Sequence, residues 1–270
     1  MESKKLEALL MAVDLGSFTK AAEVLGYTQS GLTHMMNSLE KEVGFTLLER
    51  GRSGVRLTEE GERIALTRDF SGLALKNDLV SLIRDRRSAR IYTNETMTPD
   101  ELSFLLWATQ GIKKIRGKAY ATIRTVPCGG ARHEFETYLI VRNVAGLRPG
   151  AYHYLPMLHA LEFLQPVDDI PETINQTLCG QKWAAKANVV FYWSVVPYRA
   201  EWRYGIYAHR IALIDAGHVG QALYTACTGL GLGTCGLGAF QHEKCCDLFG
   251  TARRSISSTP PPSARSATRT

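Results

Sequence analysis

The loop and strand that decide the fold lie in the middle of the chain, where residues 124–144 read RTVPCGGARHEFETYLIVRNV. The first ten of these residues form a polar loop, and its Gly129-Gly130 pair lets the backbone approach a ligand closely because glycine has no Cβ. The Tyr, Leu, Ile and Val residues that follow favour a strand from Phe135 to Val144. We therefore predict a ligand-binding loop that leads directly into a sheet.

Two helices and a second strand are predicted around this loop. Residues 98–111 predict a helix whose TPDE start supplies a threonine N-cap, a proline in the first turn and a capping-box glutamate. The apolar run of residues 189–193 predicts a buried strand. Residues 211–229 predict a mostly apolar helix, in which we interpret Asp215 and His218 as an internal polar pair.

A glycine-rich run follows that helix, and residues 231–236 (GLGTCG) match the dinucleotide-binding pattern GxGxxG. That pattern functions when it follows a strand, opens a helix and precedes an acidic residue by about 20 positions. Here it follows a predicted helix, and residues 251–260 contain no acid. The context excludes a Rossmann-type nucleotide site.

A basic segment, residues 86–92 (RRSARIY), precedes these elements. Arg86, Ser88 and Arg90 alternate, so in an extended segment they would project from one face. Three such donors suit a phosphate or an anionic ring. The alternative is a solvated basic run at the end of a helix.

The first 43 residues predict three short helices. Residues 6–15 form the first, which Gly16 closes, and Ser17 caps a second over residues 18–25. Thr28 caps the third, whose outward side chains are short and polar, as expected of residues that read base edges in a major groove; a plain solvated face is the alternative. The outward residues are Gln29, Ser30, Thr33, His34 and Asn37.

A hairpin follows, since residues 47–57 (LLERGRSGVRL) contain two short apolar runs joined by a Gly/Ser turn. Arg50, Arg52 and Arg56 concentrate positive charge on it, where they could neutralise phosphates. Residues 1–65 nevertheless carry 8 Lys/Arg and 10 Asp/Glu, a net charge of −2, so the overall charge of +6 is no indicator of DNA binding.

Residues 3–66 resemble the LysR-type winged helix-turn-helix. The matching motifs are GSFT at 16–19, AA at 21–22, TQS at 28–30, LER at 48–50 and LTEEG at 57–61, with Gly31 where the family often has proline. The resemblance implies double-stranded DNA as partner, with Gln29, Ser30, Thr33, His34 and Asn37 as candidate base or backbone contacts and Arg50, Arg52 and Arg56 as phosphate contacts. It also implies a helix from Thr58 that pairs two subunits on two half-sites.

Residues 80–250 resemble the FMN-dependent nitroreductase-like fold, in its branch of peptide thiazole and oxazole dehydrogenases (SagB/ThcOx type). The matching motifs are RRSxR at 86–90, LSxLLWATQG at 102–111, RTVPxGGARH at 124–133, DAGH at 215–218 and GLGLGTC at 229–235. This fold implies FMN at the interface of a homodimer, NAD(P)H as a possible electron donor, and a small-molecule or peptide substrate.

The same resemblance assigns residues to the cofactor. Arg86 and Ser88 would hold the FMN phosphate, and Arg90 would lie at the flavin N1/O2 edge, where a cation stabilises the anionic reduced flavin. The amides near Gly238 and Ala239 would face flavin N5. The expected cofactor-binding set is Arg86, Arg87, Ser88, Arg90, Pro127, Cys128, Gly129, Gly130, Leu237, Gly238 and Ala239.

This sequence departs from the family at four places. Cys128 stands where serine is usual, and Glu134 where proline is usual. In the dehydrogenase branch, a Lys-Tyr pair is associated with base chemistry. The nearest counterpart here is the candidate catalytic pair Arg203-Tyr204. An arginine stays protonated and therefore does not readily act as a base. A closing strand is usual after Gly250, whereas residues 251–270 are rich in Thr, Arg, Ser and Pro, as in a disordered, truncated or frameshifted tail.

Length and composition are those of a two-domain globular protein: 270 residues, 45% hydrophobic and 21% charged. Without a membrane-spanning run or signal layout, we expect a cytoplasmic protein. Six cysteines without a CxxC pair argue against structural zinc, and no metal is expected. We predict a winged helix-turn-helix over 1–66, a helical linker over 67–80, an α+β FMN-binding domain with a mostly antiparallel sheet over 81–250, and a disordered tail over 251–270.

Two functions fit these features. The first is an FMN-dependent oxidoreductase that carries a DNA-binding domain. The second is a transcriptional regulator whose flavin-binding domain dimerises the chain or senses redox state or a ligand without turnover. A third interpretation, a fusion or sequence artefact, would place the error near residues 66–80 or after Gly250.

Overall fold

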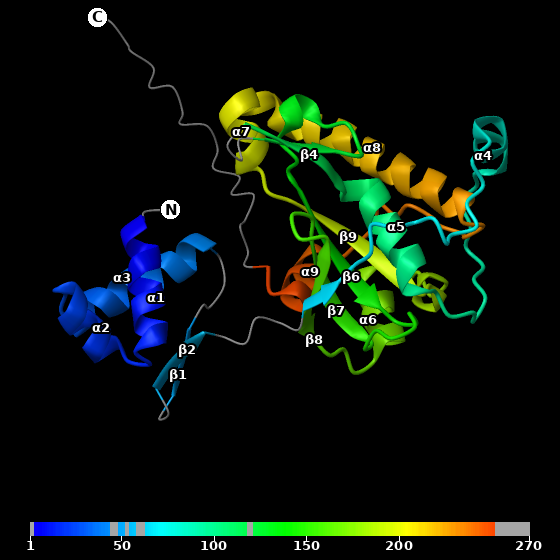
Figure 1. The fold of residues 1–270 in the computed structure, drawn as a ribbon. Helices are drawn as coiled ribbons and strands as arrows, with labels where there is room; N and C mark the ends of the chain where they lie inside the picture. Colours follow the sequence, from blue (N-terminus) through cyan, green and yellow to red (C-terminus); the bar gives the residue numbers. More distant parts are fainter. Residues whose placement is uncertain (1–2, 44–47, 52–53, 58–62, 118–120, 252–270) are drawn as a thin grey trace, which may run out of the picture.

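The computed structural model describes residues 3–43, 48–51, 54–57, 63–117 and 121–251 (Figure 1). Its order of elements is the predicted one: a small helical unit with a hairpin, followed by a larger α+β unit. Among the helices in these ranges, none is both long and apolar enough to cross a membrane.

The N-terminal unit packs three helices around one core. The structure has Ser17 as N-cap of the second helix, where its hydroxyl accepts a hydrogen bond from the Lys20 amide, and Gly26 in the left-handed conformation ends that helix. Leu32, Met36 and Leu39 of the third helix are fully buried against Ala8 and Ala12 of the first. The helices are α1 (Ser3–Asp14), α2 (Phe18–Leu25) and α3 (Gln29–Val43).

The predicted hairpin is present as β1 (Leu48–Gly51) and β2 (Gly54–Leu57), paired antiparallel. Leu48 and Val55 bury their side chains in the helical core, and the Val55 amide donates to the Gly16 carbonyl at 2.8 Å. The hairpin is therefore fixed to the helices and forms a wing of a winged helix-turn-helix.

A five-stranded sheet in the order β3-β8-β7-β6-β9 forms the centre of the larger unit, with antiparallel pairing throughout. Alternation along β6 sends Leu139 and Val141 to one face and Ile140 to the other, so both faces carry a core. The strands are β3 (Arg63–Ala65), β6 (Phe135–Val141), β7 (Gly150–Leu155), β8 (Ala160–Gln165) and β9 (Val189–Val195).

Helices cover both faces of this sheet (Figure 1). Helix α5 (Pro99–Gln110), which begins with the predicted capping box, packs on one face and against the long helix α8 (Ala208–Gly229). Helices α6 (Ile170–Thr177) and α9 (His242–Phe249) cover the other face. The remaining elements are α4 (Leu79–Asp85), α7 (Tyr198–Tyr204) and the hairpin of β4 (Ile112–Arg116) and β5 (Ala121–Arg124).

The strand predicted as buried, β9, lies at an edge of the sheet, and its side chains are half-buried or exposed rather than buried. The prediction treated a continuous apolar run as a central strand. An antiparallel edge strand paired only with β6 can carry the same composition, because its apolar side chains are shared between the core and the surface.

The predicted helical linker is wrong. Residues 58–62 lie outside the described residues, but residues 67–78 contain no helix, and α4 begins only at Leu79. Just before this segment, residues 63–65, which were assigned to the N-terminal unit, form strand β3, and Ile64 and Leu66 pack into the core of the larger unit. Burial on a sheet edge therefore outweighs local helix propensity at residues 63–66.

A buried histidine holds the end of this strand in place. His159 is 1% exposed, and its Nε2 lies 2.9 Å from the Thr67 carbonyl and from Ser103 Oγ, while its Nδ1 lies 2.7 Å from the Tyr154 hydroxyl. Both ring nitrogens are therefore engaged. The chain that leaves the wing is bound to the sheet by a strand and by this buried polar network.

Candidate functional sites

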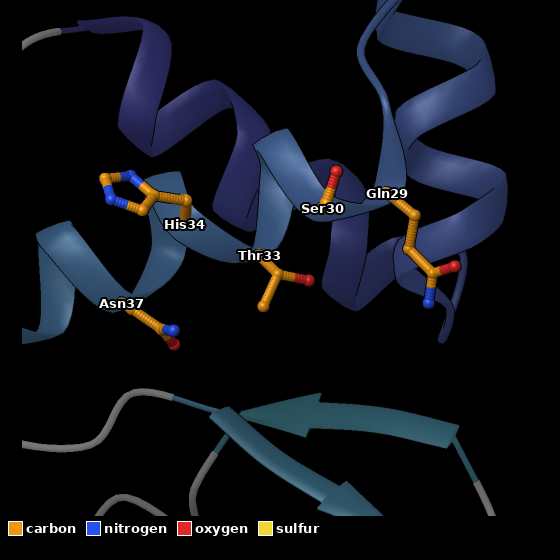
Figure 2. A pocket seen from close by; sticks show the side chains of 5 residues that line it. All are labelled: Gln29, Ser30, Thr33, His34 and Asn37. Atoms are coloured by element: carbon orange, nitrogen blue, oxygen red, sulfur yellow. The ribbon is translucent and has the colours of Figure 1, made fainter.

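The residues predicted to read DNA gather on one side of α3. Gln29, Thr33 and Asn37 follow each other at intervals of four residues and point the same way, and Ser30 and His34 form the adjacent column (Figure 2). Together the five line a shallow hollow, and all except the half-buried Thr33 are exposed. Thr28 caps the helix by accepting a hydrogen bond from the Gly31 amide at 3.1 Å.

Two of the three predicted wing arginines lie in described strands of the hairpin. Arg50 lies in β1 opposite Val55, and Arg56 lies in β2 opposite Glu49. Arg52 lies outside the described residues. The five outward residues of α3 include no lysine, arginine, aspartate or glutamate, so the wing arginines are the expected phosphate contacts and α3 is expected to contact base edges.

The predicted phosphate-binding segment lies beside the glycine-rich run. The Ala89 amide donates to the Thr234 carbonyl at 2.9 Å, and Ser88 forms a parallel bridge with Thr234. Tyr224 of α8 joins the two segments, because its hydroxyl lies 2.9 Å from Ser88 Oγ and accepts from the Gly236 amide at 2.8 Å. The segment of Leu237, Gly238 and Ala239 follows directly.

The guanidinium groups of this segment lie over aromatic rings. Arg86 lies over Tyr224 at 5.5 Å, and Arg90 lies over Trp183 at 5.8 Å. In the described part of the chain, no carboxylate pairs with Arg86, Arg87 or Arg90. Their charge is therefore available to an anionic ligand.

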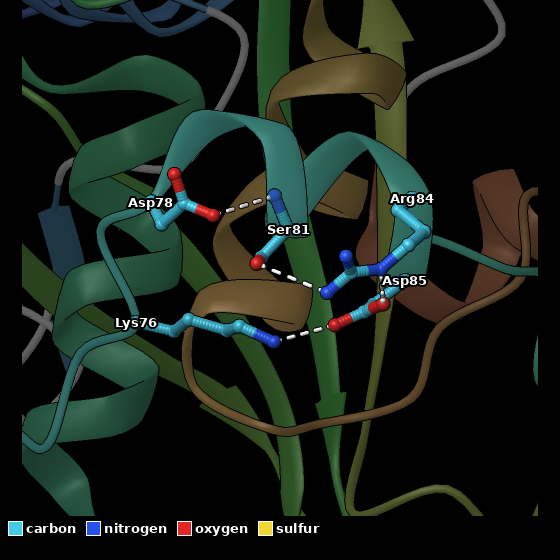
Figure 3. Close-up of polar contacts among 5 residues, drawn as sticks. All are labelled: Lys76, Asp78, Ser81, Arg84 and Asp85. Atoms are coloured by element: carbon cyan, nitrogen blue, oxygen red, sulfur yellow. Dashed lines mark hydrogen bonds and ion pairs between the residues drawn. The ribbon is translucent and has the colours of Figure 1, made fainter.

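Arg86 is the residue that ends helix α4. Figure 3 shows the polar contacts that hold this helix among Lys76, Asp78, Ser81, Arg84 and Asp85. Asp78 caps the helix by accepting from the Ser81 amide at 2.9 Å, and Asp85 pairs with both Lys76 and Arg84. These hydrogen bonds hold the pKa of Asp78 and Asp85 below the usual value. Arg84 is thus engaged, whereas Arg86, two residues later, is not.

The predicted cofactor loop packs on the other end of α8. The Gly129 amide donates to Asp215 Oδ2 at 2.8 Å, and Gly130 has a left-handed φ of 57°. A Cβ on Gly130 would lie 2.6 Å from the Tyr204 hydroxyl and 2.9 Å from Arg203 Nε. Gly130 is therefore required both for its backbone conformation and for the space it leaves, and Arg203 and Tyr204 lie against the loop.

A hollow of about 360 Å³ opens beside this loop. Burial lowers the pKa of His133, one of its lining residues, to about 4, so this imidazole is neutral near pH 7. Its Nε2 lies 3.0 Å from the Thr122 carbonyl. The lining comprises Lys113, residues 122–128, Ala131 and His133.

Within one chain the two halves of the predicted cofactor site are separate. Tyr224, which contacts the phosphate-binding segment, follows Asp215, which contacts the loop, by nine residues of α8, or about 13 Å along the helix axis.

Sequence reasoning missed three residues of these sites. Asp215 does pair with His218, whose Nδ1 lies 3.3 Å away, but its anchoring of the Gly129 amide was not foreseen. Tyr224 and Trp183, which support the arginines, were not singled out. Tyr224 lies on the same helix as Asp215 and His218. Its polar hydroxyl in a mostly apolar helix was the sequence signal that could have identified it as a site residue.

Fold and sites together define a two-part protein, in which a winged helix-turn-helix precedes an α+β domain with an unpaired basic segment at residues 86–90 among the described residues. Residues 83–258 match the nitroreductase family, and residues 3–62 match the bacterial regulatory helix-turn-helix proteins of the lysR family. The chain belongs to the nitroreductase family, and its N-terminal unit is a LysR-type helix-turn-helix.

Individual relatives support both parts. A Methanocaldococcus jannaschii protein named as a nitroreductase is 33% identical over 176 residues, which are 65% of this chain and 84% of that protein. A Ralstonia eutropha structure described as a nitroreductase has a TM-score of 0.57 at 20% identity over 72% of this chain and 84% of its own. The Acinetobacter baylyi regulator BenM is 43% identical over 61 residues, which are 23% of this chain and 20% of BenM.

Proposed function

We propose that this protein is an FMN-dependent oxidoreductase that carries its own LysR-type DNA-binding unit. Nitroreductase-family proteins generally use flavin cofactors. The observation that carries the proposal furthest is the placement of Arg86 and Ser88 around Tyr224, with Arg86, Arg87 and Arg90 lacking a carboxylate partner in the described chain. A phosphate, with about two negative charges, suits this set of donors.

The residues present fit FMN at both ends of the cofactor. Arg86, Arg87 and Ser88 would hold the phosphate, and Arg90 would face the ring edge that becomes negative on reduction. Leu237, Gly238 and Ala239 would contact FMN from the same chain as Arg86. Pro127, Cys128, Gly129 and Gly130 would contact it from the second chain, across the interface of a homodimer. FMN would supply transfer of a hydride or electrons, with NAD(P)H as the donor.

The substrate class follows from the SagB/ThcOx-type motifs, which favour a small molecule or a modified peptide. Arg203 and Tyr204 lie against the cofactor loop and would contact the substrate. Because an arginine stays protonated, it would orient or neutralise an anionic group rather than accept a proton.

The experiment is to purify the full chain and follow its flavin absorbance during anaerobic addition of NADH or NADPH. Bleaching, followed by reoxidation with a quinone or a nitroaromatic compound, is the expected result. A colourless protein that takes up no added FMN would rule out the enzymatic half of the proposal.

We propose double-stranded DNA as the partner of the N-terminal unit. Gln29, Ser30, Thr33, His34 and Asn37 would read bases, and Arg50, Arg52 and Arg56 would contact phosphates. Since the recognition face has no Lys or Arg, the wing should carry most of the salt dependence. Replacing Arg50 with glutamine should lower the slope of log affinity against log salt by about 1, whereas Thr33→Ala should alter sequence preference at an unchanged slope.

A regulator that senses flavin state without turnover is the second candidate. The attachment of β3 to β8 favours it, because the segment that follows the wing is part of the flavin-domain sheet. Operator binding that changes with flavin reduction, combined with no turnover of any acceptor, would favour this function over catalysis.

A further inference from the structure

Two residues that depart from the family pattern, Cys128 and Glu134, contact each other. Cys128 Sγ lies 3.3 Å from Glu134 Oε2 and accepts a hydrogen bond from the His133 amide at 2.9 Å. The carboxylate of Asp215 completes the cluster, and one sulfur or oxygen atom from each of the three side chains lies within 4.8 Å of the others. The loop, the segment before β6, and α8 each supply one residue.

The two carboxylates of the cluster are buried, and Cys128 is half-buried. Glu134 is 0% exposed and Asp215 is 3% exposed. Among the described residues, neither carboxylate pairs with a lysine or arginine, and Glu134 Oε1 has no hydrogen-bond partner. An unpaired buried acid is costly, so two acids and a thiol around one point favour a cation between them.

His218 provides a fourth possible ligand. It stands one turn after Asp215 on α8, and its Nδ1 lies 3.3 Å from Asp215 Oδ1 and makes no hydrogen bond. The His218 side chain is 40% exposed, and Cys128 also lines the hollow beside the loop, so the cluster can be reached from solvent.

We propose that Cys128, Glu134 and Asp215 form a binding site for one divalent cation of the zinc class, with His218 beside it. One sulfur, two carboxylates and a nearby imidazole are the mixed ligand set that Zn²⁺ accepts, whereas magnesium and calcium prefer oxygen alone. Burial raises the pKa of the Cys128 thiol to about 12 in the metal-free cluster. A coordinated cation would displace that proton.

This site goes beyond the proposed function, since it concerns metal binding rather than flavin or DNA. The absence of CxxC spacing excluded a zinc site built from one local motif. It did not address ligands drawn from three separate elements, which only the tertiary structure brings together.

The test uses the full chain, dialysed against a chelator and then titrated with Zn²⁺ or Co²⁺. We expect one ion per chain by elemental analysis, a higher melting temperature with Zn²⁺, and a thiolate-to-cobalt band with Co²⁺. Glu134→Gln should weaken binding at least about tenfold, and Cys128→Ser should abolish the thiolate band.

Two matched variants control for charge and thiol count. Asp168→Asn removes an exposed acid elsewhere, and Cys246→Ser removes a thiol near His242; both should bind like the wild type. Three results would overturn the proposal. The wild type could bind no metal, Glu134→Gln could bind it with wild-type affinity, or Cys246→Ser could lose binding while Cys128→Ser keeps it. Circular dichroism of each variant shows that it has folded.

Discussion

Arg86 shows how one unpaired charge can be tested against a paired neighbour. It lies over Tyr224 without a carboxylate partner in the described chain, whereas Arg84 of the same helix bonds to Asp85 and Ser81. If Arg86 holds the FMN phosphate, Arg86→Gln should weaken FMN binding about 10- to 100-fold, because a charge-assisted hydrogen bond contributes about 1.5–3 kcal/mol. Quenching of flavin fluorescence during titration measures the affinity.

Arg84→Gln is the control for that measurement. It removes the same charge from the same short helix, and it should change FMN affinity by less than about threefold, because the lost pair is exposed. Equal losses in the two variants would mean that general electrostatic attraction, rather than contact by Arg86, supports binding.

Gly130 allows backbone strain and crowding to be separated. Its φ of 57° costs a non-glycine residue about 1 kcal/mol or more, and a Cβ would also meet the Tyr204 hydroxyl at 2.6 Å. Gly146 has a φ of 73° and nothing within 4 Å of a built Cβ. Gly130→Ala should therefore lower the free energy of unfolding by about 1–2 kcal/mol more than Gly146→Ala does.

Urea denaturation of both variants measures this difference. Equal destabilisation would show that Tyr204 and Arg203 can move away without cost. In that case their position against the loop would not be a constraint on the site.

At the scale of single residues, the sequence identified several candidate site residues but did not predict which side chains contact each other. The alternation of Arg86, Ser88 and Arg90 and the Gly129-Gly130 pair were visible because local chemistry limits where such residues occur. The contact between Cys128 and Glu134 could not be foreseen, because it depends on how a loop turns back on itself. The same applies to Asp215, whose partner lies 86 residues away.

Helices and strands formed as predicted where the local sequence carried a strong signal, such as a helix cap. Ser17 and Thr98 cap the helices that they were expected to cap, since a side-chain acceptor is available only at a helix start. Strand β3 was missed because three residues carry little pattern, and because its partner β8 lies about 100 residues later in the chain. Its stability comes from tertiary pairing rather than local propensity.

A charged network on the sheet predicts a pH dependence of stability. His153 Nε2 lies 3.1 Å from Glu136 Oε2, and its Nδ1 lies 3.9 Å from Glu162 Oε2. Burial alone would lower the pKa of His153, but hydrogen bonds to Glu136 and Glu162 outweigh it and raise this pKa above 6.5. Such a group stabilises the fold below its unfolded pKa and loses that contribution as pH rises through the folded value.

The free energy of unfolding of the wild type should therefore exceed that of His153→Gln near pH 6, and the difference should shrink towards pH 9, by about 1 kcal/mol for each unit of pKa shift. Denaturant titrations at the two pH values check this. His209→Gln, at an exposed position, should leave the unfolding energy unchanged at both. A difference that grows with pH would contradict the assigned protonation state.

At the scale of the whole molecule, the described segment that follows the wing belongs to the sheet of the larger domain. Residues 63–67 enter this sheet through β3, through the ion pair of Arg63 with the half-buried Glu162, and through the His159 network. Composition alone could not predict this, because it shows where domains are but not how the connecting segment packs.

The proposed division of the cofactor site between two chains predicts complementation. Arg86 and Gly130 act at opposite ends of α8, so in a heterodimer of an Arg86→Gln chain and a Gly130→Ala chain one site carries both changes and the other carries neither. Heterodimers isolated with two affinity tags should bind one FMN per dimer with wild-type affinity. A heterodimer of Arg86→Gln and Ser88→Ala chains should not recover, because both changes fall in the same half of a site. If a single chain supplies the whole site, every site of the first heterodimer would keep one defect, and neither pair would regain tight binding.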